Sequence, residues 1–446
     1  MGYLNEVIIE VKNRNKNEAE FIQAVFEVFS NMEILFDDNE ELRKGAILER
    51  LIEPERSIQF KVPWEDDLGK IHVNRGYRVQ FNSAIGPYKG GLRFNPNVNL
   101  SIMKFLAFEQ TLKNALTGLP IGGAKGGSDF NPKGKSNAEI KRFCNSFMLE
   151  LYRHIGPDVD VPAGDMGVGA REIGFMYGQY RRIMANSERG VLTGKAVSYG
   201  GSLCRKEATG YGLVYFLNEI LTRMNDSLVD KRVVISGSGN VAIYAAEKVI
   251  ANKGRVIAMS DSQGYIIDDD IDLDTIKLIK EVKHSSLSEY PELCGRGRYQ
   301  NGSVYDDRSL RYDIALPCAT QNEIDINRAK NIVSNGCFIV AEGANMPNDN
   351  EAIAYYLAND VVFAPGKAAN AGGVATSALE MTQNSMRYGW SFEEVDAKLH
   401  AIMVNIHRQC VDAIKQYHLN TYDYVKGANI AALNIVLKAM IEQGDY

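Results

Sequence analysis

The apolar residues of this chain recur at a helical spacing in some segments and at a strand-like spacing in others. Apolar positions three or four residues apart predict helices over residues 17–36, 99–117, 136–155, 391–417 and 428–442. Residues 57–64 and 71–82 alternate and are rich in β-branched residues, which predicts two strands. The helix over 136–155 opens with Ser136 and Glu139, the spacing of an N-terminal capping box.

After about residue 200 the pattern changes to short apolar runs that alternate with Gly-rich turns and helices. Residues 231–236 and 255–260 predict buried strands, and between them lie a turn over 237–240 and a helix over 241–252. Further apolar runs that end in Gly or Pro follow, at YDIALPC, CFIVAEGANMP and VVFAPGKAANAGG. This alternation is typical of an α/β fold with a doubly wound parallel sheet, and it places a domain boundary near residue 200.

The turn over 237–240 has the residues of a phosphate-binding turn. Gly237, Gly239 and Ala242 follow a predicted strand and open a predicted helix, which is the context of the dinucleotide-binding fingerprint. The first Gly permits a tight turn, the second lets a pyrophosphate approach the backbone, and the helix N-terminus offers N–H groups to the phosphates. The sequence therefore predicts a dinucleotide site; the alternative is a Gly-rich turn required only for packing.

The residues after the second of these strands leave the choice of nicotinamide cofactor open. Asp261 lies near the spacing of roughly 20 residues from the first Gly that is typical of an acid bound to ribose, which favours NAD. Ser260 and Ser262 flank it, and their hydroxyls could donate to the 2′-phosphate of NADP. Lys280 and Lys283 could add positive charge from the next helix.

A second group of residues combines lysines with glycines, and its members are Lys89, Gln110, Lys113, Lys125 and Asp165. Gln110 and Lys113 are three residues apart on a predicted helix and share a face. The others lie in Gly-rich segments that we expect to form loops, where a backbone can closely approach a ligand. A single lysine is typically a solvated charge, but several together suit a small dianion. One ammonium that is crowded and desolvated would have a lowered pKa and could act as a base, while Asp165 could carry a proton to or from a nitrogen.

Composition and charge exclude several classes of protein. The chain has 446 residues, of which 45% are hydrophobic and 24% charged, as in an ordinary globular protein of two or three domains. A net charge of −6 gives no reason to expect nucleic acid as a partner. The N-terminus lacks the layout of a signal peptide, and no run of 18 apolar residues predicts a membrane span. The six Cys and six His residues are dispersed, so we expect no metal site and the reduced thiols of a cytoplasmic protein.

These motifs together resemble the glutamate dehydrogenases of the hexameric, small-subunit class, within the Glu/Leu/Phe/Val dehydrogenase family. The resemblance runs from about residue 55 to the C-terminus. Its carriers are YKGGLRF at 88–94, EQTLKNALTGLPIGGAKGG at 109–127, VPAGDMGVG at 161–169, KEATGYG at 206–212, SGSGNVA at 236–242, AEGANMP at 341–347 and FAPGKAANAGGV at 363–374.

The resemblance implies a role for each candidate of the lysine group. Lys125 corresponds to the catalytic lysine that activates water against an iminium carbon, and Asp165 to the acid that passes the proton at the amino group. The carbonyl of Gly164 corresponds to a substrate contact. The remaining residues correspond to substrate-binding groups: Lys89 and Ser377 for the side-chain carboxylate, Gln110 and Lys113 for the α-carboxylate.

The resemblance also favours NADP over NAD as the cofactor. Thr209 and Asn240 match cofactor contacts, and the run Ser260-Asp261-Ser262 is similar to that of the NADP-using members. The implied reaction interconverts L-glutamate with 2-oxoglutarate and ammonia in amino-acid metabolism and nitrogen assimilation. The implied fold has an N-terminal α/β substrate and oligomerisation domain over 1–200, to which a C-terminal helix over 421–446 returns. A cleft separates it from a Rossmann-like domain over 201–420, and the implied assembly is a homohexamer.

Three alternatives to this interpretation are open. An NAD-dependent glutamate dehydrogenase would use Asp261 as the ribose acid. A dehydrogenase of branched-chain or aromatic amino acids would lack a cationic partner for the substrate side chain, and Lys89 with Ser377 argues against it. A non-catalytic amino-acid sensor on the same scaffold would lack Lys125 or Asp165, and both are present.

Overall fold

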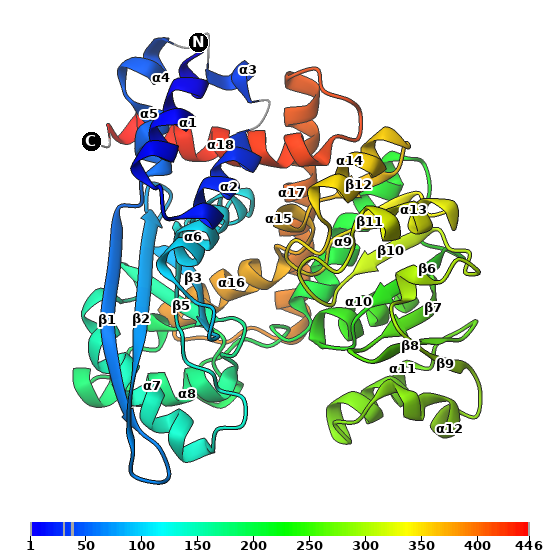
Figure 1. Cartoon of the computed structure of the whole chain (residues 1–446), viewed down its shortest axis with the longest axis horizontal. Helices are drawn as coiled ribbons and strands as arrows, with labels where there is room; N and C mark the ends of the chain where they lie inside the picture. The colour runs from blue at the N-terminus through cyan, green and yellow to red at the C-terminus, as the bar shows by residue number, and fades with distance from the viewer. Residues whose placement is uncertain (1, 30–31, 37–39, 445–446) are drawn as a thin grey trace. The chain divides into compact units, whose positions relative to one another are not determined.

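The computed structural model describes residues 2–29, 32–36 and 40–444 and divides the chain into two units (Figure 1). Unit 1 comprises Met1–Leu203, Ser377–Ser391 and Ala432–Tyr446; unit 2 comprises Cys204–Thr376 and Phe392–Ala431. Two of the boundaries fall inside helices, α16 (Gly372–Met386) and α18 (Tyr424–Gln443).

Unit 1 is built on a mixed sheet of five strands in the order β1-β2-β4-β3-β5. The strands are β1 (Arg56–Glu65), β2 (Ile71–Asn82), β3 (Tyr88–Phe94), β4 (Gly123–Ser128) and β5 (Asp160–Gly164). β1 and β2 form an antiparallel hairpin, and β2 also pairs antiparallel with β4. β3 runs parallel to both of its neighbours, β4 and β5. The strands predicted over 57–64 and 71–82 are confirmed as β1 and β2.

Helices of unit 1 form an N-terminal group and a group that lies between and after the later strands. The first group is α1 (Tyr3–Arg14), α2 (Ala19–Phe29), α3 (Glu33–Phe36), α4 (Glu40–Lys44) and α5 (Ile47–Ile52). The second is α6 (Leu100–Leu116), α7 (Asn137–Leu151) and α8 (Ala170–Met184), with 3₁₀ turns at Tyr152–His154, Arg189–Val191 and Val197–Tyr199. The helix predicted over 17–36 corresponds to α2 and a separate α3, and residues 30–31 lie outside the described residues.

The predicted capping box at the start of α7 is confirmed. Ser136 accepts a hydrogen bond from the backbone N–H of Glu139, and the Glu139 carboxylate accepts one from the backbone N–H of Ser136. The helix then buries Phe143 and Phe147 in an aromatic core with Phe94 and Phe130. The rings of Phe130 and Phe143 stack with centroids 3.8 Å apart. Aromatic side chains bury large apolar areas, so this cluster is a major source of cohesion between α7 and the sheet.

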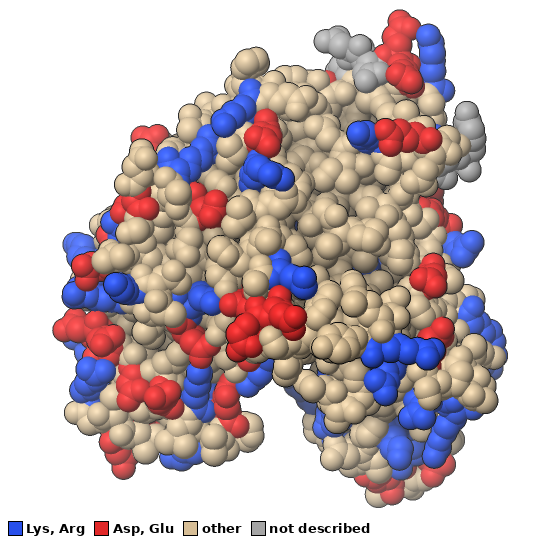
Figure 2. Space-filling model, turned by 180° about the vertical axis from the view of Figure 1, so that it is seen from behind, with Lys and Arg blue, Asp and Glu red and all other residues tan. Residues whose placement is uncertain are grey.

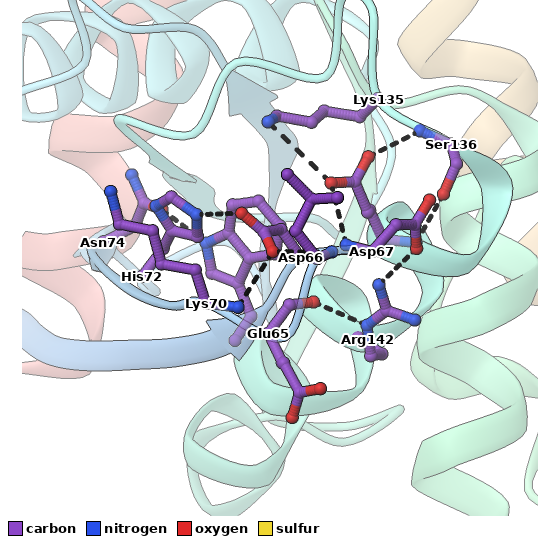
Figure 3. Close-up of polar contacts among 12 residues, drawn as sticks. Glu65, Asp66, Asp67, Lys70, His72, Asn74, Lys135, Ser136 and Arg142 are labelled. Carbon is purple, nitrogen blue, oxygen red and sulfur yellow. Dashed lines mark hydrogen bonds and ion pairs between the residues drawn. The ribbon is translucent and has the colours of Figure 1, made fainter.

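The turn between β1 and β2 is fixed by its own polar network (Figure 3). Asp66 accepts hydrogen bonds from the N–H groups of Leu68 and Lys70, each at 2.9 Å, and contacts the His72 ring at 2.8 Å. The His72 contact and the backbone donors lower the pKa of Asp66 to about 2. Arg142 of α7 donates to the Glu65 carbonyl and to the Asp67 carboxylate, both at 2.6 Å. The hairpin is therefore tied to α7 as well as to its neighbouring strand.

Unit 2 contains a sheet of seven strands in the order β12-β11-β10-β6-β7-β8-β9. They are β6 (Arg232–Ser236), β7 (Arg255–Ser260), β8 (Gly264–Ile267), β9 (Arg298–Asn301), β10 (Ile314–Pro317), β11 (Ile339–Ala341) and β12 (Val362–Ala364). Strands β6, β7, β10, β11 and β12 are parallel, as predicted. β8 and β9 are antiparallel, so the predicted parallel sheet carries an antiparallel extension at this edge. Only residues 261–263 separate β7 from β8, and a connection this short cannot make a parallel crossover.

Helices of unit 2 lie before, between and after its strands. They are α9 (Ala208–Arg223), α10 (Asn240–Ala251), α11 (Leu273–Lys277), α12 (Tyr290–Cys294), α13 (Ile326–Ser334), α14 (Asn350–Ala358), α15 (Gly366–Ala369) and α17 (Phe392–Gln416). A π-helical turn at Leu278–Val282 and 3₁₀ turns at Leu287–Glu289 and Val304–Asp306 complete the unit. The predicted strand-turn-helix-strand over 231–260 is confirmed as β6, α10 and β7.

Three features bear on the expected setting of the chain: an apolar helix, the surface charges and the cysteines. α18 is the one helix among the described residues that is long and apolar enough to cross a membrane, but 61% of that window is buried inside the protein, as in a core helix. Basic and acidic side chains are interspersed on the face shown in Figure 2. The cysteines are free, and all except Cys294 are buried.

Candidate active site

The glycine-rich segments of unit 1 that we expected to be loops are strands, so that expectation is wrong. YKGGLRF forms β3, and most of GGAKGG forms β4. A Cβ on Gly90 would lie 1.6 Å from the carbonyl oxygen of Ala124, and one on Gly126 would lie 2.7 Å from that of Tyr77. The glycines are needed because neighbouring backbone passes too close for any side chain. Lys89 and Lys125 therefore project from the rigid centre of a sheet.

Most of the segment VPAGD is also a strand and not a loop. Its first part belongs to β5, which lies beside β3, and Asp165 follows directly after the strand ends at Gly164. A Cβ on Gly91 would lie 2.8 Å from both the Gly164 carbonyl oxygen and the Asp165 Cβ. Gly91 thus lets the end of β5 approach β3 closely. The strand order β4-β3-β5 brings Lys125 and Asp165 to the same place.

Lys125, Asp165 and Arg93 form the central cluster of this site. The Lys125 Nζ lies 3.1 Å from Oδ2 of Asp165, and Arg93 Nε donates to the same oxygen at 2.8 Å. Among the described residues no group binds Oδ1 of Asp165. Lys125 is 5% exposed. Two cations therefore fix one carboxylate oxygen and leave the other for a ligand.

The electrostatics of this cluster favour proton transfer. Burial lowers the pKa of the Lys125 ammonium; the Asp165 anion opposes that shift, and the charge of Arg93 adds to it. Burial alone would raise the pKa of the Asp165 carboxyl, but Lys125 and Arg93 outweigh it and lower the pKa to about 2. Asp165 is therefore an anion at neutral pH, and Lys125 loses its proton more readily than a surface lysine.

A buried ion pair that sequence reasoning missed supports the strands of this site. Arg78 of β2 pairs with Asp160 at the start of β5, and neither side chain has exposed surface. Arg78 also donates to the Gly90 carbonyl at 3.1 Å, and Gln80 donates to Asp160 at 2.9 Å. A charged residue inside the strand-like run GYRVQFN was the only signal in the sequence, and its partner lies 82 residues away.

Lys89 is buried on β3 and donates from Nζ to the Thr193 hydroxyl at 2.7 Å. Its backbone carbonyl accepts from the side chain of Asn114, which also donates to the Gly122 carbonyl at 2.5 Å. Gln110 in turn donates to the Asn114 oxygen at 2.7 Å. Asn114 therefore ties the face of α6 that carries Gln110 to β3.

The remaining two candidates of unit 1 lie on helices. Lys113 is half-buried on α6, one turn after Gln110, so the two share a face as predicted. Ser377 is 2% exposed on α16. Three residues later, Glu380 accepts hydrogen bonds from the segment that contains Thr193, the partner of Lys89.

In unit 2 the Gly-rich turn has the geometry of a phosphate-binding turn. Gly237 has φ of +90°, which favours glycine, and its N–H donates to the Ser260 hydroxyl at 2.8 Å. A Cβ on Gly239 would meet no atom within 4 Å, so this side of the backbone is open. Gly239 and Asn240 are exposed at the start of α10. The open backbone and the helix N-terminus fit the pyrophosphate of a dinucleotide.

The carboxylate of Asp261 is occupied by groups of its own unit. Oδ2 accepts from the N–H of Leu287 at 2.8 Å, and Oδ1 accepts from the N–H of Gln263 at 3.0 Å. Burial opposes the shift, but these and other backbone donors lower the pKa of this carboxyl. Lys280 Nζ lies 3.8 Å from Oδ2. Ser262, by contrast, is exposed.

Three further candidates of unit 2 have neighbours within that unit. Thr209 lies in the first turn of α9, and a Cβ on Gly373 would lie 2.6 Å from its hydroxyl oxygen. Ser260 is buried and accepts from the turn, so its hydroxyl already has a partner. Lys283 pairs with Glu289.

Comparison with known proteins places the chain among amino-acid dehydrogenases. Residues 200–444 match the family Glutamate/Leucine/Phenylalanine/Valine dehydrogenase, and residues 54–182 match the Glu/Leu/Phe/Val dehydrogenase dimerisation domain. The chain is 52% identical to an NADP-specific glutamate dehydrogenase of Haemophilus influenzae and 51% identical to an NAD-specific one of Clostridium symbiosum, with 99% of each chain covered. Its structure is similar to that of Plasmodium falciparum glutamate dehydrogenase, with a TM-score of 0.96, 48% identity and coverage of 99% and 95%.

Proposed function

Because the chain belongs to the Glu/Leu/Phe/Val dehydrogenase family, we propose that it catalyses the reversible oxidative deamination of L-glutamate. The products are 2-oxoglutarate and ammonia, and NADP is the preferred cofactor. The observation that carries the proposal is the buried contact of 3.1 Å between the Lys125 ammonium and the Asp165 carboxylate. Relatives that are named glutamate dehydrogenases match over their full length, which supports the same reaction.

The two residues divide the proton transfers of this reaction. Loss of a hydride from the α-carbon turns the substrate amine into an iminium, which water must attack. Lys125, with its lowered pKa, takes a proton from that water. Asp165, an anion before the step, then takes the proton of the newly formed hydroxyl group through its unoccupied oxygen, Oδ1, and passes it to the departing nitrogen, which leaves as ammonia. When bound, the nicotinamide accepts the hydride, and Gly237, Gly239 and Asn240 would hold its pyrophosphate.

The carboxylates of the substrate are assigned to separate groups of unit 1. Lys89 and Ser377 bind the side-chain carboxylate, and Gln110 and Lys113 bind the α-carboxylate, while the Gly164 carbonyl accepts from the substrate amine. Lys89 is 1% exposed and Ser377 is 2% exposed. An apolar substrate side chain offers a buried ammonium no negative charge, which disfavours branched-chain and aromatic amino acids.

NADP is proposed over NAD because of the surroundings of Asp261. A carboxylate whose two oxygens already accept backbone N–H groups is poorly placed to bind the ribose hydroxyls of NAD. Ser262 is exposed and can donate to a 2′-phosphate, and Lys280 adds a nearby positive charge. Thr209 is proposed as a further cofactor contact. Relatives of either cofactor specificity match at nearly equal identity, so overall identity does not separate them.

We also propose a homohexamer in the cytoplasm. A match to the dimerisation domain of the family supports self-association, and a Thermus thermophilus relative with 29% identity is described as a hetero-hexameric glutamate dehydrogenase. Light scattering on the purified chain should give six times the chain mass of 49.5 kDa. A monomer or dimer would contradict the hexamer.

The function is tested by following nicotinamide absorbance with 2-oxoglutarate, ammonia and either NADPH or NADH. We expect oxidation of the cofactor that requires both other substrates and is faster with NADPH. The same assay with the 2-oxo acids of leucine and phenylalanine should give far lower kcat/KM. Equal use of these acids would overturn the assignment to glutamate, and no turnover with any of them would favour a non-catalytic binding protein.

A further inference from the structure

A buried ion pair outside the cluster of Lys125, Asp165 and Arg93 joins α16 to residues 192–195 of unit 1. Lys195 Nζ lies 2.7 Å from Oε1 of Glu380, and neither side chain has exposed surface. The other oxygen of Glu380, Oε2, accepts from the N–H of Gly194 at 2.9 Å. Lys195 also donates to the carbonyl of Leu192. Glu380 therefore holds the segment 192–195 by its backbone and by a side chain.

Burying the charges of Lys195 and Glu380 costs free energy, so their presence inside the protein requires an explanation. Desolvating two charges consumes much of the attraction between them, and an apolar pair of similar volume often stabilises a protein equally well. Burial lowers the pKa of Lys195 even though Glu380 lies opposite. Stability alone therefore does not explain the pair. What it does supply is a fixed position for the residues between its two ends.

The residue that it fixes is Thr193. The hydroxyl of Thr193 accepts from Lys89 Nζ at 2.7 Å, and its N–H donates to the Pro162 carbonyl of β5 at 3.0 Å. Thr193 thus orients the Lys89 ammonium, while Glu380 and Lys195 hold the segment on which Thr193 lies.

The Lys195–Glu380 pair also bears on Ser377, the second residue assigned to the side-chain carboxylate of the substrate. Ser377 and Glu380 are three residues apart on α16 and share a face of that helix. A shift of the segment 192–195 relative to α16 would move the partner of Lys89 away from Ser377. The ion pair thereby keeps the Lys89 ammonium and the Ser377 hydroxyl at a fixed position relative to each other.

We propose that Lys195 and Glu380 are positioning residues that set the selectivity of this site for substrates whose side chain ends in a carboxylate. They act through Thr193 on Lys89 and through α16 on Ser377, and they do not touch the substrate. The inference rests on the proposed function, since it assigns the side-chain pocket to Lys89 and Ser377.

The test removes both charges at once, because removing one would leave the other buried and unpaired. We compare the wild type with Lys195→Met/Glu380→Leu and measure kcat/KM for glutamate and for norvaline, which lacks the side-chain carboxylate. We expect the glutamate-to-norvaline ratio to fall at least tenfold, through a higher KM for glutamate, while kcat/KM for norvaline changes less than threefold. If the double variant fails to fold, Glu380→Gln serves in its place: it keeps the volume and leaves the Lys195 charge without its anion, and it should lower the ratio in the same direction.

A matched control is the ion pair of Lys104 and Glu18, which are 2.5 Å apart in unit 1. Lys104→Met/Glu18→Leu should lower the melting temperature and leave the substrate ratio unchanged. A second readout needs no turnover: glutarate should raise the melting temperature of the wild type more than pentanoate does, and the Lys195/Glu380 variant should lose this difference.

The outcomes separate the two proposals. A folded Lys195/Glu380 variant that keeps the wild-type ratio and the wild-type response to glutarate overturns the positioning role. A wild type that turns over norvaline as efficiently as glutamate overturns the proposed function instead. In that case the melting temperatures decide. If glutarate stabilises the wild type more than pentanoate does and the Lys195/Glu380 variant loses this difference, the positioning role is supported. If the wild type shows no such difference, the positioning role is refuted.

Discussion

The Lys125 ammonium lies 3.1 Å from the Asp165 carboxylate, although Lys125 belongs to β4 and Asp165 follows the last residue of β5. β3 lies between these strands and supplies Arg93, which binds the same carboxylate oxygen at 2.8 Å. The contact between these two proposed proton-transfer residues is thus a product of strand order, and their charge states depend on a third residue, Arg93.

Replacing Lys125 by Ala should leave the fold intact and reduce kcat for glutamate oxidation by about 10²–10⁴-fold, the usual contribution of a general base. The exposed Lys133, in the same unit, provides the control, because Lys133→Ala removes a lysine without touching the cluster. Steady-state rates with circular dichroism on both variants check this. A folded Lys125→Ala enzyme with normal turnover would remove Lys125 from the mechanism.

Replacing Arg93 by Gln should move the acid limb of the pH profile for glutamate oxidation to higher pH. Loss of the Arg93 charge removes a like charge from Lys125, so the pKa of that ammonium rises. It also removes a stabilising cation from the Asp165 anion, so that pKa rises from its value of about 2. In the proposed mechanism the neutral amine of Lys125 is the active form, so the variant should need a more alkaline solution, by about one pH unit.

The control for this variant is Arg93→Lys, which keeps the charge and should restore most of the wild-type profile. The measurement is kcat/KM across pH 6 to 10 for all three enzymes. A Gln variant that is slower by the same factor at every pH would show that Arg93 has a structural role only.

Replacing Ser262 by Ala should reduce the preference for NADPH over NADH. A hydrogen bond to a charged phosphate is worth about 1.5–3 kcal/mol, so kcat/KM with NADPH should fall about tenfold or more while that with NADH changes little. Ser260→Ala should act differently, since Ser260 accepts from the N–H of Gly237 and supports the turn for either cofactor. Wild-type enzyme that uses NADH more efficiently would assign Asp261 to the ribose and refute the NADP assignment.

Replacing Lys89 by Leu together with Ser377 by Val should lower kcat/KM for glutamate by orders of magnitude and raise the relative use of norvaline. An apolar pocket would bury the substrate carboxylate without a charge to pair with it. Lys113→Ala is the matched comparison: it should weaken glutamate and norvaline alike, because both share the α-carboxylate. An unchanged ratio in the Lys89/Ser377 variant would place the side-chain pocket elsewhere.

The sequence alone was enough to predict helices, strands and turns that depend on residues close together in the chain. The apolar spacing of α6 and α7, the capping box at Ser136 and Glu139, and the strand, turn and helix around Gly237 are confirmed. Each depends on residues within one or two turns of chain, so a single sequence suffices to predict it. The residue types of the candidate site, lysines among glycines, were visible for the same reason.

Tertiary structure decided what depends on distant residues. The glycines around Lys89 and Lys125 suggested loops, yet they lie in strands because backbone from elsewhere in the chain leaves no room for a Cβ. The sequence left Asp261 with two possible roles, and the N–H of Leu287, 26 residues later, occupies its carboxylate. The pair Lys195 and Glu380 is separated by 185 residues. Such contacts leave no local signal, because only the folded sheet and helices bring the partners within reach.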